Sequence, residues 1–315
     1  MYLVTGGAGF VGSHLAARLV ERGESVRVFD NLSTGKLDNL ASLGFLTAEF
    51  VEGDLPDADA VRRAMAGVEV VLHQAADPSV PRSMADPAAC YAANVSGTVN
   101  VLQAAREAGV RRVVFASSCA VYGDAPGLPK TERSPVAPMS PYATSKLAGE
   151  HLCQVYTRAF GVEAVALRYF NVFGPRQDPN SAYAPVIPRF TKAIRDGEPP
   201  VIYGDGEQTR DFVYVDDVVQ ANLLAAQSPD APGKIFNIAS GRFVSLNRLL
   251  ASLIEIIGRP CQPTYLPARP GDVRHSAADA SAAAAAFGFE ILVPFQLGLA
   301  RTVEAMAPAA LAGAA

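Results

Sequence analysis

The segment 5–12, which reads TGGAGFVG, constrains the fold of this chain more than any other part of the sequence. It follows a β-rich run at 2–5 and opens a helical pattern, so its glycines lie in a turn between a strand and a helix. Glycine permits a tight turn there and lets backbone amides at the helix N-terminus approach a pyrophosphate. A second β-rich run, at 25–30, ends in Asp30, where a carboxylate would accept hydrogen bonds from an adenosine ribose and repel a 2′-phosphate. The sequence therefore predicts an NAD site; an ordinary turn beside an unrelated aspartate is the alternative.

The alternation of strands and helices continues through the first 170 residues. Asp86 can cap a helix that begins at Pro87 and ends at Gly109, and Ser140 can cap a helix that ends at Gly161. Strands that alternate with helices form βαβ units. We therefore expect an α/β fold, a Rossmann-type doubly wound parallel sheet with helices on both faces. Its further strands are expected at 48–52, 68–73, 112–117 and 164–169.

The pattern changes after Gly174, where prolines become frequent. We expect residues 1–172 plus about 208–242 to form the NAD-binding domain. Residues from about 173 to 207 plus 243–315 should form a smaller, C-terminal domain that binds the substrate.

Three shorter segments have local patterns of their own. A strand-like run at 211–215 and a helix from Asp216 should rejoin the sheet domain. The alanine run 282–286 is expected to be helical, and the end of the chain after Pro308 should be frayed.

Composition and charge exclude several classes of function. Lysine and arginine total 27 against 31 aspartates and glutamates, so the formal net charge of −4 offers no basic excess for a nucleic-acid partner. No apolar run approaches the roughly 18 residues of a membrane span. The four cysteines and four histidines are dispersed without metal-ligand spacing, so no metal is expected. Because the N-terminus shows no signal-peptide pattern, we expect a cytoplasmic protein.

Tyr142 and Lys146 lie four residues apart near the start of the helix that Ser140 caps. Residues at this spacing share a helix face, so the ammonium can lie beside the phenol. A phenol is a poor base at neutral pH, but a nearby cation and the charge of an oxidised nicotinamide favour the phenolate. Ser117 and Ser118 end a strand at the edge where α/β sheets bind ligands, and a hydroxyl there could hydrogen-bond the oxygen that Tyr142 deprotonates. A capped strand end and an ordinary surface tyrosine are the alternative interpretation.

Together these motifs resemble those of the extended short-chain dehydrogenase/reductases, and among them the nucleotide-sugar 4-epimerases. The resemblance extends from Tyr2 to about Phe289. It implies NAD as cofactor, a UDP-sugar as substrate, and a homodimer formed through the helices at 87–108 and 141–160. Its further motifs are 53–55 (GDL), 73–76 (HQAA), 94–98 (NVSGT), 168–176 (RYFNVFGPR), 204–206 (GDG), 209–212 (TRDF) and 269–275 (RPGDVRH).

The resemblance also implies roles for individual residues. The catalytic residues would be Ser118, Tyr142 and Lys146. The NAD site would be formed by Gly6, Gly9, Phe10, Val11, Gly12, Asp30, Asn31, Ser33, Thr34, Gly35, Asp54, Leu55, Gln74, Ala75, Ala76, Asn94, Ser117, Tyr142, Lys146 and Tyr169. The substrate would be held by Val80, Arg82, Ser118, Asn171, Val186, Val201, Tyr203, Arg210, Arg269, Asp272 and Ser276.

Within the substrate set, the resemblance is more specific about five residues. Asn171 would bond the sugar or its phosphate, and Arg210 and Arg269 would clamp the diphosphate, a role that suits planar guanidinium groups. Tyr203 would pack on the uracil ring, and Asp272 would hold the uridine ribose.

Members of this family share a first step, in which the C4 hydroxyl of the sugar is oxidised with the tyrosine as base. Related 4,6-dehydratases have an Asp-Glu pair directly after the catalytic serine or threonine, and related uronate decarboxylases have a glutamate there. This chain has Cys119 and Ala120 instead. We therefore expect C4 epimerisation through a 4-keto intermediate. The alternatives are a dehydratase or decarboxylase of the same family, or a non-catalytic NAD-binding regulatory module.

Ser276 bears on which sugar is turned over. It stands four residues after Asp272, at a position that borders the sugar pocket in the family. Members with tyrosine at this position resemble enzymes limited to glucose and galactose, whereas members with a small residue also accept 2-N-acetyl sugars. The sequence therefore favours UDP-GlcNAc and UDP-GalNAc as the substrate pair and also allows UDP-Glc and UDP-Gal.

Overall fold

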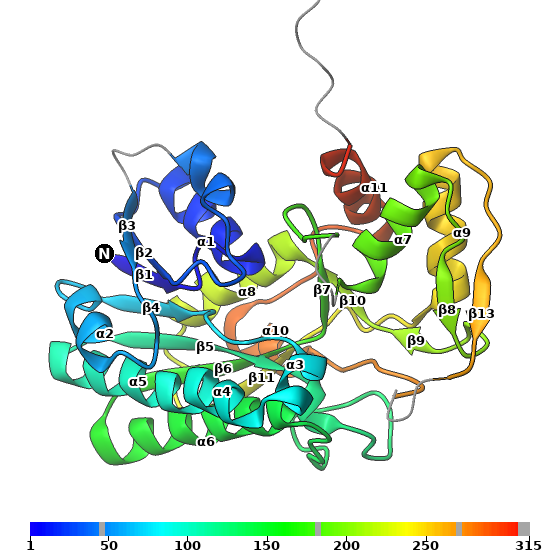
Figure 1. Cartoon of the computed structure of the whole chain (residues 1–315). Helices are drawn as coiled ribbons and strands as arrows, with labels where there is room; N and C mark the ends of the chain where they lie inside the picture. The colour runs from blue at the N-terminus through cyan, green and yellow to red at the C-terminus, as the bar shows by residue number, and fades with distance from the viewer. Residues whose placement is uncertain (44–47, 180–183, 269–272, 308–315) are drawn as a thin grey trace, which may run out of the picture.

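The central feature of the molecule is a parallel β-sheet with helices on both faces (Figure 1). The computed structural model describes residues 1–43, 48–179, 184–268 and 273–307. Within these residues the sheet has seven strands in the order β11-β6-β5-β4-β1-β2-β3, and each neighbouring pair is parallel. The expected doubly wound sheet is therefore confirmed. The strands are β1 (Tyr2–Thr5), β2 (Val26–Asp30), β3 (Ala48–Glu52), β4 (Val70–His73), β5 (Arg112–Ser118), β6 (Glu163–Tyr169) and β11 (Ile235–Ile238).

The strand order reverses between β1 and β4. The chain leaves β1 toward β2 and β3, and then crosses back to place β4 on the other side of β1. In open α/β sheets, ligands bind in the crevice at the carboxyl ends of the strands where such a reversal occurs. The glycine-rich turn after β1 and the segment after β4 therefore meet at this crevice.

Alternate residues of the central strands enter two different cores. Val4 and Leu72 belong to the core on one face, whereas Leu3 and Val71 belong to the core on the other. Both faces are buried, which is why these strands are continuous apolar runs. The first face is covered by α1 (Phe10–Glu21), α8 (Val215–Gln227) and α10 (Ser281–Phe287), and the second by α2 (Ala58–Ala64), α5 (Gly97–Ala108) and α6 (Pro141–Phe160).

The helix expected from Pro87 to Gly109 contains one irregular turn. It runs as α4 (Pro87–Tyr91), a π-helical turn η2 (Ala92–Ser96) and α5. The Asp86 carboxylate caps its start, and Gly109 ends it with φ +68°. Inserted π turns are rare and occur frequently at functional sites. This one carries the buried residue Asn94.

The remaining elements form a smaller region with an apolar core of its own. Three two-stranded sheets lie here: β7 (Asn171–Phe173) with β10 (Phe212–Tyr214), β9 (Thr209–Arg210) with β12 (Val244–Ser245), and β8 (Val201–Tyr203) with β13 (Thr264–Leu266). They pack with α7 (Val186–Asp196), α9 (Leu246–Ile257) and α11 (Phe295–Ala305). Short helices elsewhere are η1 (Leu37–Leu43), α3 (Val80–Ala85) and η3 (Cys119–Tyr122).

Two expectations about the later part of the chain need correction. The run at 211–215 does not join the main sheet; its strand, β10, pairs with β7 instead. The strand that does extend the main sheet is β11, whose four residues are too few to show a clear periodicity. The alanine run is helical as expected, but α10 packs on the main sheet beside β11 and α8 rather than on the smaller region.

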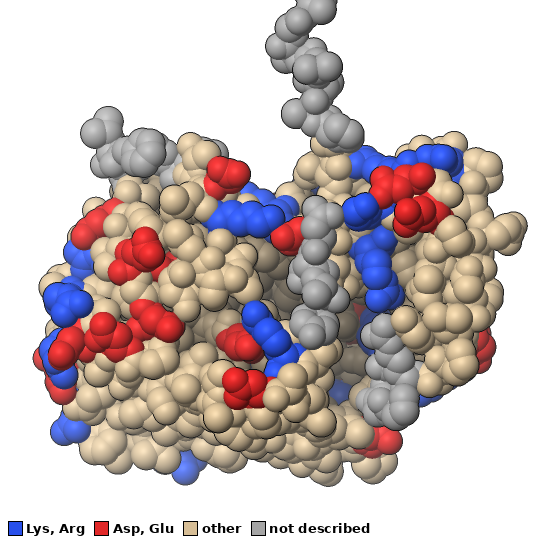
Figure 2. All heavy atoms as spheres, in the orientation of Figure 1, with Lys and Arg blue, Asp and Glu red and all other residues tan. Residues whose placement is uncertain are grey.

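The space between the two regions is hollowed, as Figure 2 shows. Lysine and arginine side chains, in blue, lie along this hollow, interspersed with acidic side chains, in red. In the described part of the chain, no helix combines the length and apolarity that a membrane crossing requires.

Candidate active site

The glycine-rich turn after β1 forms a cradle that side chains would fill. Gly6 has φ +67°, and a Cβ added to it would lie 2.7 Å from backbone atoms of Ala75, the second residue after β4. A Cβ on Gly12 would overlap the carbonyl oxygen of Gly6. The close approach of the turn to the segment after β4 therefore needs glycine at position 6, and the close approach of α1 to the turn needs glycine at position 12.

The N-terminus of α1 is open to an anion. Its N-cap residue, Gly9, offers no side-chain cap, and its first turn contains no acidic residue. The amides of this turn point away from the helix and carry the positive end of its dipole. A pyrophosphate would accept hydrogen bonds from them, so the residues of this cradle fit the expected cofactor.

Asp30 lies at the end of β2, as expected, and its carboxylate also shapes the cradle. Its Oδ2 atom accepts a hydrogen bond from the Ala8 amide at 2.9 Å, and Oδ1 accepts one from the Leu32 amide at 2.8 Å. Gly35 approaches the same carboxylate so closely that an added Cβ would lie 2.9 Å from Oδ1. Asp30 thus ties the glycine turn to the loop after β2.

A chain of hydrogen bonds runs from β1 and β4 to the π turn η2. Thr5 Oγ1 lies 2.7 Å from His73 Nδ1, and His73 Nε2 lies 3.1 Å from Thr98 Oγ1. Thr98 donates to the Asn94 carbonyl, so its oxygen accepts from Nε2–H and Nδ1 accepts from Thr5. Burial, with the nearby charge of Lys146, lowers the pKa of His73 to about 3. His73 is therefore a neutral spacer and does not exchange protons near neutral pH.

The Asn94 side chain braces the segment that follows β4. Its Nδ2 atom donates to the Asp77 carbonyl at 3.1 Å and to Ser145 Oγ at 3.0 Å, while Oδ1 accepts from the Asp77 amide at 2.7 Å. Ser145 lies on α6 between Tyr142 and Lys146. The π turn therefore joins the wall of the crevice to the helix that carries these two residues.

The structure brings Ser118, Tyr142 and Lys146 together at the carboxyl end of β5. Ser118 lies beside Tyr142, close enough for its hydroxyl to lower the pKa of the phenol. The Nζ atom of Lys146 is 5.9 Å from the centre of the Tyr142 ring and donates to the Ala116 carbonyl at 2.9 Å. Ser118 also accepts a hydrogen bond from the Ala120 amide, which fixes its side chain at the start of η3.

Burial controls the ionisation of both α6 residues. It raises the pKa of Tyr142 to about 12, against the opposing effect of the Ser118 hydrogen bond. It lowers the pKa of Lys146 to about 8. The groups of the chain alone therefore keep the phenol protonated at neutral pH. Lys146 alone therefore does not stabilise the phenolate enough at neutral pH. The expected phenolate would need the positive charge of an oxidised nicotinamide as well.

Residues from the smaller region face this site across the hollow. Arg210, on β9, lies close enough to Cys119 to influence the pKa of its thiol. Asn171 donates through Nδ2 to the Asp211 carbonyl at 3.0 Å, and the Ser276 amide donates to the Thr209 carbonyl at 3.2 Å. Three expected substrate residues, Asn171, Arg210 and Ser276, are thus collected around β9.

The other expected substrate residues are less closely grouped. Val80 begins α3, and Arg82 on the same helix forms an ion pair with Asp77 at 2.6 Å. Arg269 and Asp272 lie outside the described residues. Val186 begins α7, and Val201 and Tyr203 are the first and last residues of β8.

The expected cofactor residues also differ in what they contact. The Asn31 side chain donates to Asp54 at 2.9 Å beside β2. The side chains of Gln74 and Tyr169 both donate hydrogen bonds to the buried amide oxygen of Asn222, on α8. Of the remaining residues of that set, Gly6 and Gly9 lie in the turn after β1, and Phe10, Val11 and Gly12 form the first turn of α1. The others lie in loops, at 33–35, at 55 and at 75–76.

Ser117 behaves differently from Ser118. Its hydroxyl donates to the buried carboxylate of Glu150 at 2.5 Å, on α6. Its side chain is thus engaged by the protein rather than presented to a cofactor.

Three residues at the site were not singled out from the sequence. Glu150 and Asn222 look like ordinary polar positions of amphipathic helices. Asp211 is fully buried and accepts hydrogen bonds from Ser240 and from the Gly241 amide, which fixes the loop beside β9. Its place within the motif TRDF was the one available signal.

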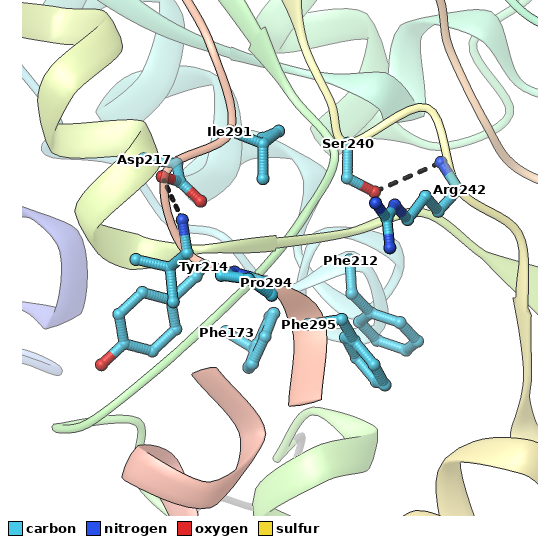
Figure 3. Close-up of a pocket in the computed structure, with 10 residues that line it drawn as sticks. Phe173, Phe212, Tyr214, Asp217, Ser240, Arg242, Ile291, Pro294 and Phe295 are labelled. Atoms are coloured by element: carbon cyan, nitrogen blue, oxygen red, sulfur yellow. Dashed lines mark hydrogen bonds between the residues drawn. The ribbon is translucent and has the colours of Figure 1, made fainter. Parts of the chain in front are cut away.

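A separate small pocket lies in the core of the smaller region (Figure 3). Phe173, Phe212 and Phe295 form its aromatic wall, and Asp217 lies at its opposite side. It contains none of the expected catalytic residues. Among the described residues, no cluster of histidine, cysteine, aspartate and glutamate could hold a metal ion.

Comparison with known proteins agrees with this geometry. Residues 2–239 match the model of the NAD dependent epimerase/dehydratase family. The chain is 42% identical over 305 residues to a UDP-glucose 4-epimerase of Mycolicibacterium smegmatis, covering 96% of this chain and 97% of that protein.

Two solved structures are similar throughout. One is a UDP-N-acetylglucosamine 4-epimerase from Methanobrevibacter ruminantium in complex with UDP-N-acetylmuramic acid (TM-score 0.92, 40% identity, 96% of each chain covered). The other is a UDP-glucose 4-epimerase from Thermus thermophilus in complex with NAD (TM-score 0.88, 39% identity, 96% of this chain and 98% of that one).

Proposed function

The chain belongs to the NAD-dependent epimerase/dehydratase family, and from this premise we propose that it interconverts UDP-GlcNAc and UDP-GalNAc and also accepts UDP-Glc and UDP-Gal. At the level its relatives share, it is an isomerase, an NAD-dependent UDP-sugar 4-epimerase. The choice between sugar pairs is the part that the relatives leave open, because both kinds of substrate occur in their names.

The observation that carries the proposed reaction is the meeting of Ser118, Tyr142 and Lys146 at the sheet edge beside the glycine turn. The glycine cradle and Asp30 would hold NAD, which would supply the acceptor and donor of a hydride. Tyr142 takes the proton of the C4 hydroxyl and later returns it. Ser118 hydrogen-bonds the phenol, and Lys146 provides positive charge beside it. The 4-keto sugar is reduced on its other face, which inverts C4.

The residues after Ser118 favour epimerisation over elimination. A dehydratase needs an acid and a base that remove water from the keto sugar. Here the next side chain is Cys119, and burial raises the pKa of its thiol to about 11, so it stays protonated near neutral pH. Ala120 offers no proton at all. The keto sugar therefore meets no further acid–base group from this segment.

The decisive experiment is incubation of the protein with UDP-Glc, UDP-Gal, UDP-GlcNAc and UDP-GalNAc in turn, without added cofactor. We expect chromatography to show each N-acetylated sugar converting into its C4 epimer. A dehydrated or decarboxylated product would identify the related reactions. A protein that binds NAD and turns over none of the sugars would be a regulatory module instead.

Ser276 supports the choice of N-acetylated sugars. It is half-buried, and its amide is tied to β9 beside Arg210, so a larger side chain there would fill space next to the substrate residues. Overpacking a tight site typically costs 1–3 kcal/mol, which corresponds to roughly ten- to a hundredfold in rate. Ser276→Tyr should depress turnover of UDP-GlcNAc and UDP-GalNAc by this factor and spare the plain hexoses. Ser276→Ala is the matched control and should keep both pairs. Equal loss of both pairs in the tyrosine variant would contradict this role.

The exposed apolar side chains of α4 and α6 support a homodimer. Tyr91 on α4 is 38% exposed, and Val155 and Phe160 on α6 are 51% and 43% exposed. A dimer formed through these two helices would cover these exposed apolar side chains. Light scattering should therefore give the mass of two chains, and the mass of one chain would reject the dimer.

A further inference from the structure

A buried ion pair lies behind the catalytic residues. Glu150, on α6, and Arg168, on β6, are 0% and 3% exposed at their side chains. The guanidinium binds the carboxylate with two hydrogen bonds, Nε to Oε1 at 2.8 Å and Nη2 to Oε2 at 2.7 Å. An ionised carboxylate this deeply buried is stable only when paired.

Glu150 has a third partner, and it belongs to the catalytic strand. Ser117 on β5 donates its hydroxyl to Oε1 at 2.5 Å. Ser117 is the sheet neighbour of Arg168 in the register between β5 and β6. The carboxylate thus joins α6, β5 and β6 at one point.

Side chains one helical turn apart attach α6 to the end of β5. Lys146 donates to the Ala116 carbonyl at 2.9 Å, Glu150 accepts from Ser117, and the Tyr142 phenol lies beside the Ser118 hydroxyl. The helix can lie this close because residue 149 is glycine, where a Cβ would overlap the Phe115 ring. Small displacements at a catalytic group can cost large factors in rate.

We propose that Glu150 is a positioning residue for the epimerase reaction: by binding the Ser117 hydroxyl it holds the end of β5 where Ser118 reaches Tyr142, and Arg168 balances its charge. This inference rests on the proposed function for its kinetic readout. A purely structural role for the pair would change stability without changing the ionisation of Tyr142.

Ser117→Ala tests the proposal because it removes the attachment and leaves the ion pair in place. We expect kcat to fall by about tenfold. KM for the UDP-sugar should stay within about twofold, because binding groups are untouched. The rising limb of kcat against pH should move to higher pH. When Ser118 is held less firmly, its hydroxyl stabilises the Tyr142 phenolate less, and the pKa of the phenol rises. Ser252→Ala is the matched control: Ser252 is a buried serine on α9 that bonds a side chain, Gln296, away from the site.

A second pair of variants separates the hydrogen bond from the charges. Both variants remove the ion pair by Arg168→Met. The first adds Glu150→Gln, whose amide oxygen can still accept a hydrogen bond from Ser117. The second adds Glu150→Leu, which has no acceptor. Replacing a buried ion pair by matched neutral or apolar groups is often tolerated. The glutamine variant should keep a higher kcat than the leucine variant. If either double variant fails to fold, Ser117→Ala alone decides.

One measurement needs no sugar and therefore stands even if no epimerisation is found. Tyrosine labelled at the ring carbon that bears the hydroxyl reports ionisation by NMR, and Tyr142→Phe assigns its signal in the NAD-loaded protein. In Ser117→Ala this signal should titrate at a higher pH than in the parent. A Ser117→Ala protein with the parent's Tyr142 titration would overturn the proposal by itself. Where epimerisation is found, a kcat within about twofold of the parent would overturn it too.

Discussion

At the scale of the residue, the proposed chemistry depends on a phenol that the protein itself keeps neutral. Burial raises the pKa of Tyr142 to about 12 and lowers that of Lys146 to about 8. The free protein thus holds a protonated Tyr142 beside a lysine that loses its charge at mildly alkaline pH. In the proposed reaction, proton transfer to Tyr142 at neutral pH would require the additional positive charge of the oxidised cofactor near the phenol.

Tyr142→Phe should fold and bind NAD but lose most turnover, because the ring still packs while the proton acceptor is gone. Proton-transfer groups typically contribute on the order of 10²–10⁴-fold. Lys146→Met should move the rising limb of the pH–rate profile to higher pH. The variant lacks a positive charge that stabilises the phenolate, so the pKa of Tyr142 should rise. Steady-state rates across pH measure both effects, with the exposed Thr144→Ala on the same helix as control. A Tyr142→Phe enzyme within about threefold of the parent would exclude Tyr142 as the base.

Asp30 should make NAD⁺ bind more tightly than NADP⁺. Because its carboxylate also holds the amides of Ala8 and Leu32, Asp30→Ala removes the negative charge and loosens the turn at once. Asp30→Asn keeps one acceptor oxygen, so it should narrow the gap between the cofactors with a smaller loss of NAD⁺ affinity. Lys36 in the following loop is paired with Asp178 at 2.8 Å, which limits its compensation of the lost charge. Titration with each cofactor checks this; equal affinity in the parent would refute the assignment.

The sequence was informative wherever one residue type is demanded by local geometry. The glycine turn, Asp30 and the Tyr142–Lys146 spacing all belong to this class, and the structure brings each to the expected place in the fold. Glu150 could not be found in this way. On an amphipathic helix a glutamate normally faces solvent, and its partner Arg168 becomes a neighbour only when β6 pairs with β5.

At the scale of the element, the predicted strands and helix ends follow from burial and capping. The Asp86 and Ser140 caps and the glycines at 109 and 161 lie where the sequence put them. The π turn in the helix after Asp86 could not be foreseen, because one inserted residue leaves the apolar spacing nearly unchanged. β11 was missed for a different reason: four residues that pair only with β6 carry too little pattern.

Gly149→Ala tests whether the close approach of α6 to β5 matters. A Cβ there would overlap the Phe115 ring, so the helix must move away from the strand that ends in Ser118. Overpacking of this kind typically costs 1–3 kcal/mol of stability. We expect a lower melting temperature and a lower kcat, although alanine has the higher helix propensity. Thr144→Ala also gains helix propensity, at an exposed position, and should be neutral or stabilising. A Gly149→Ala protein as stable and active as the parent would show that α6 can move away from β5 without loss of stability or activity.

At the scale of the whole molecule, α8 connects the sheet domain with the smaller region. Its middle carries Asn222, which bonds Gln74 and Tyr169 beside the cofactor crevice. Its first turn carries Asp217, which enters the core of the smaller region beside the aromatic pocket (Figure 3). Asp217 Oδ1 accepts hydrogen bonds from the Leu292 amide at 2.9 Å and the Val293 amide at 3.3 Å. One helix thus links the sheet domain to the segment that leads into α11.

The charge of Asp217 should make the stability of the whole fold depend on pH. Burial raises its pKa to about 6, above the value near 4 of an exposed aspartate. Between these two values the folded protein binds a proton that the unfolded chain releases. The contribution of this group to stability is therefore greatest below about pH 4, falls as the pH rises to about 6, and is constant above.

Asp217→Asn removes this titration and keeps an oxygen for the two amides. Relative to the parent, the variant should gain stability on the order of 3 kcal/mol as the pH rises from about 4 to about 7. Thermal unfolding of both proteins across this range measures the difference, and Asp230→Asn, at an exposed carboxylate, should show no such trend. If the difference between Asp217→Asn and the parent stays constant with pH, Asp217 is already charged in the folded protein throughout the range. The buried carboxylate would then have a further partner in the pocket that balances its charge.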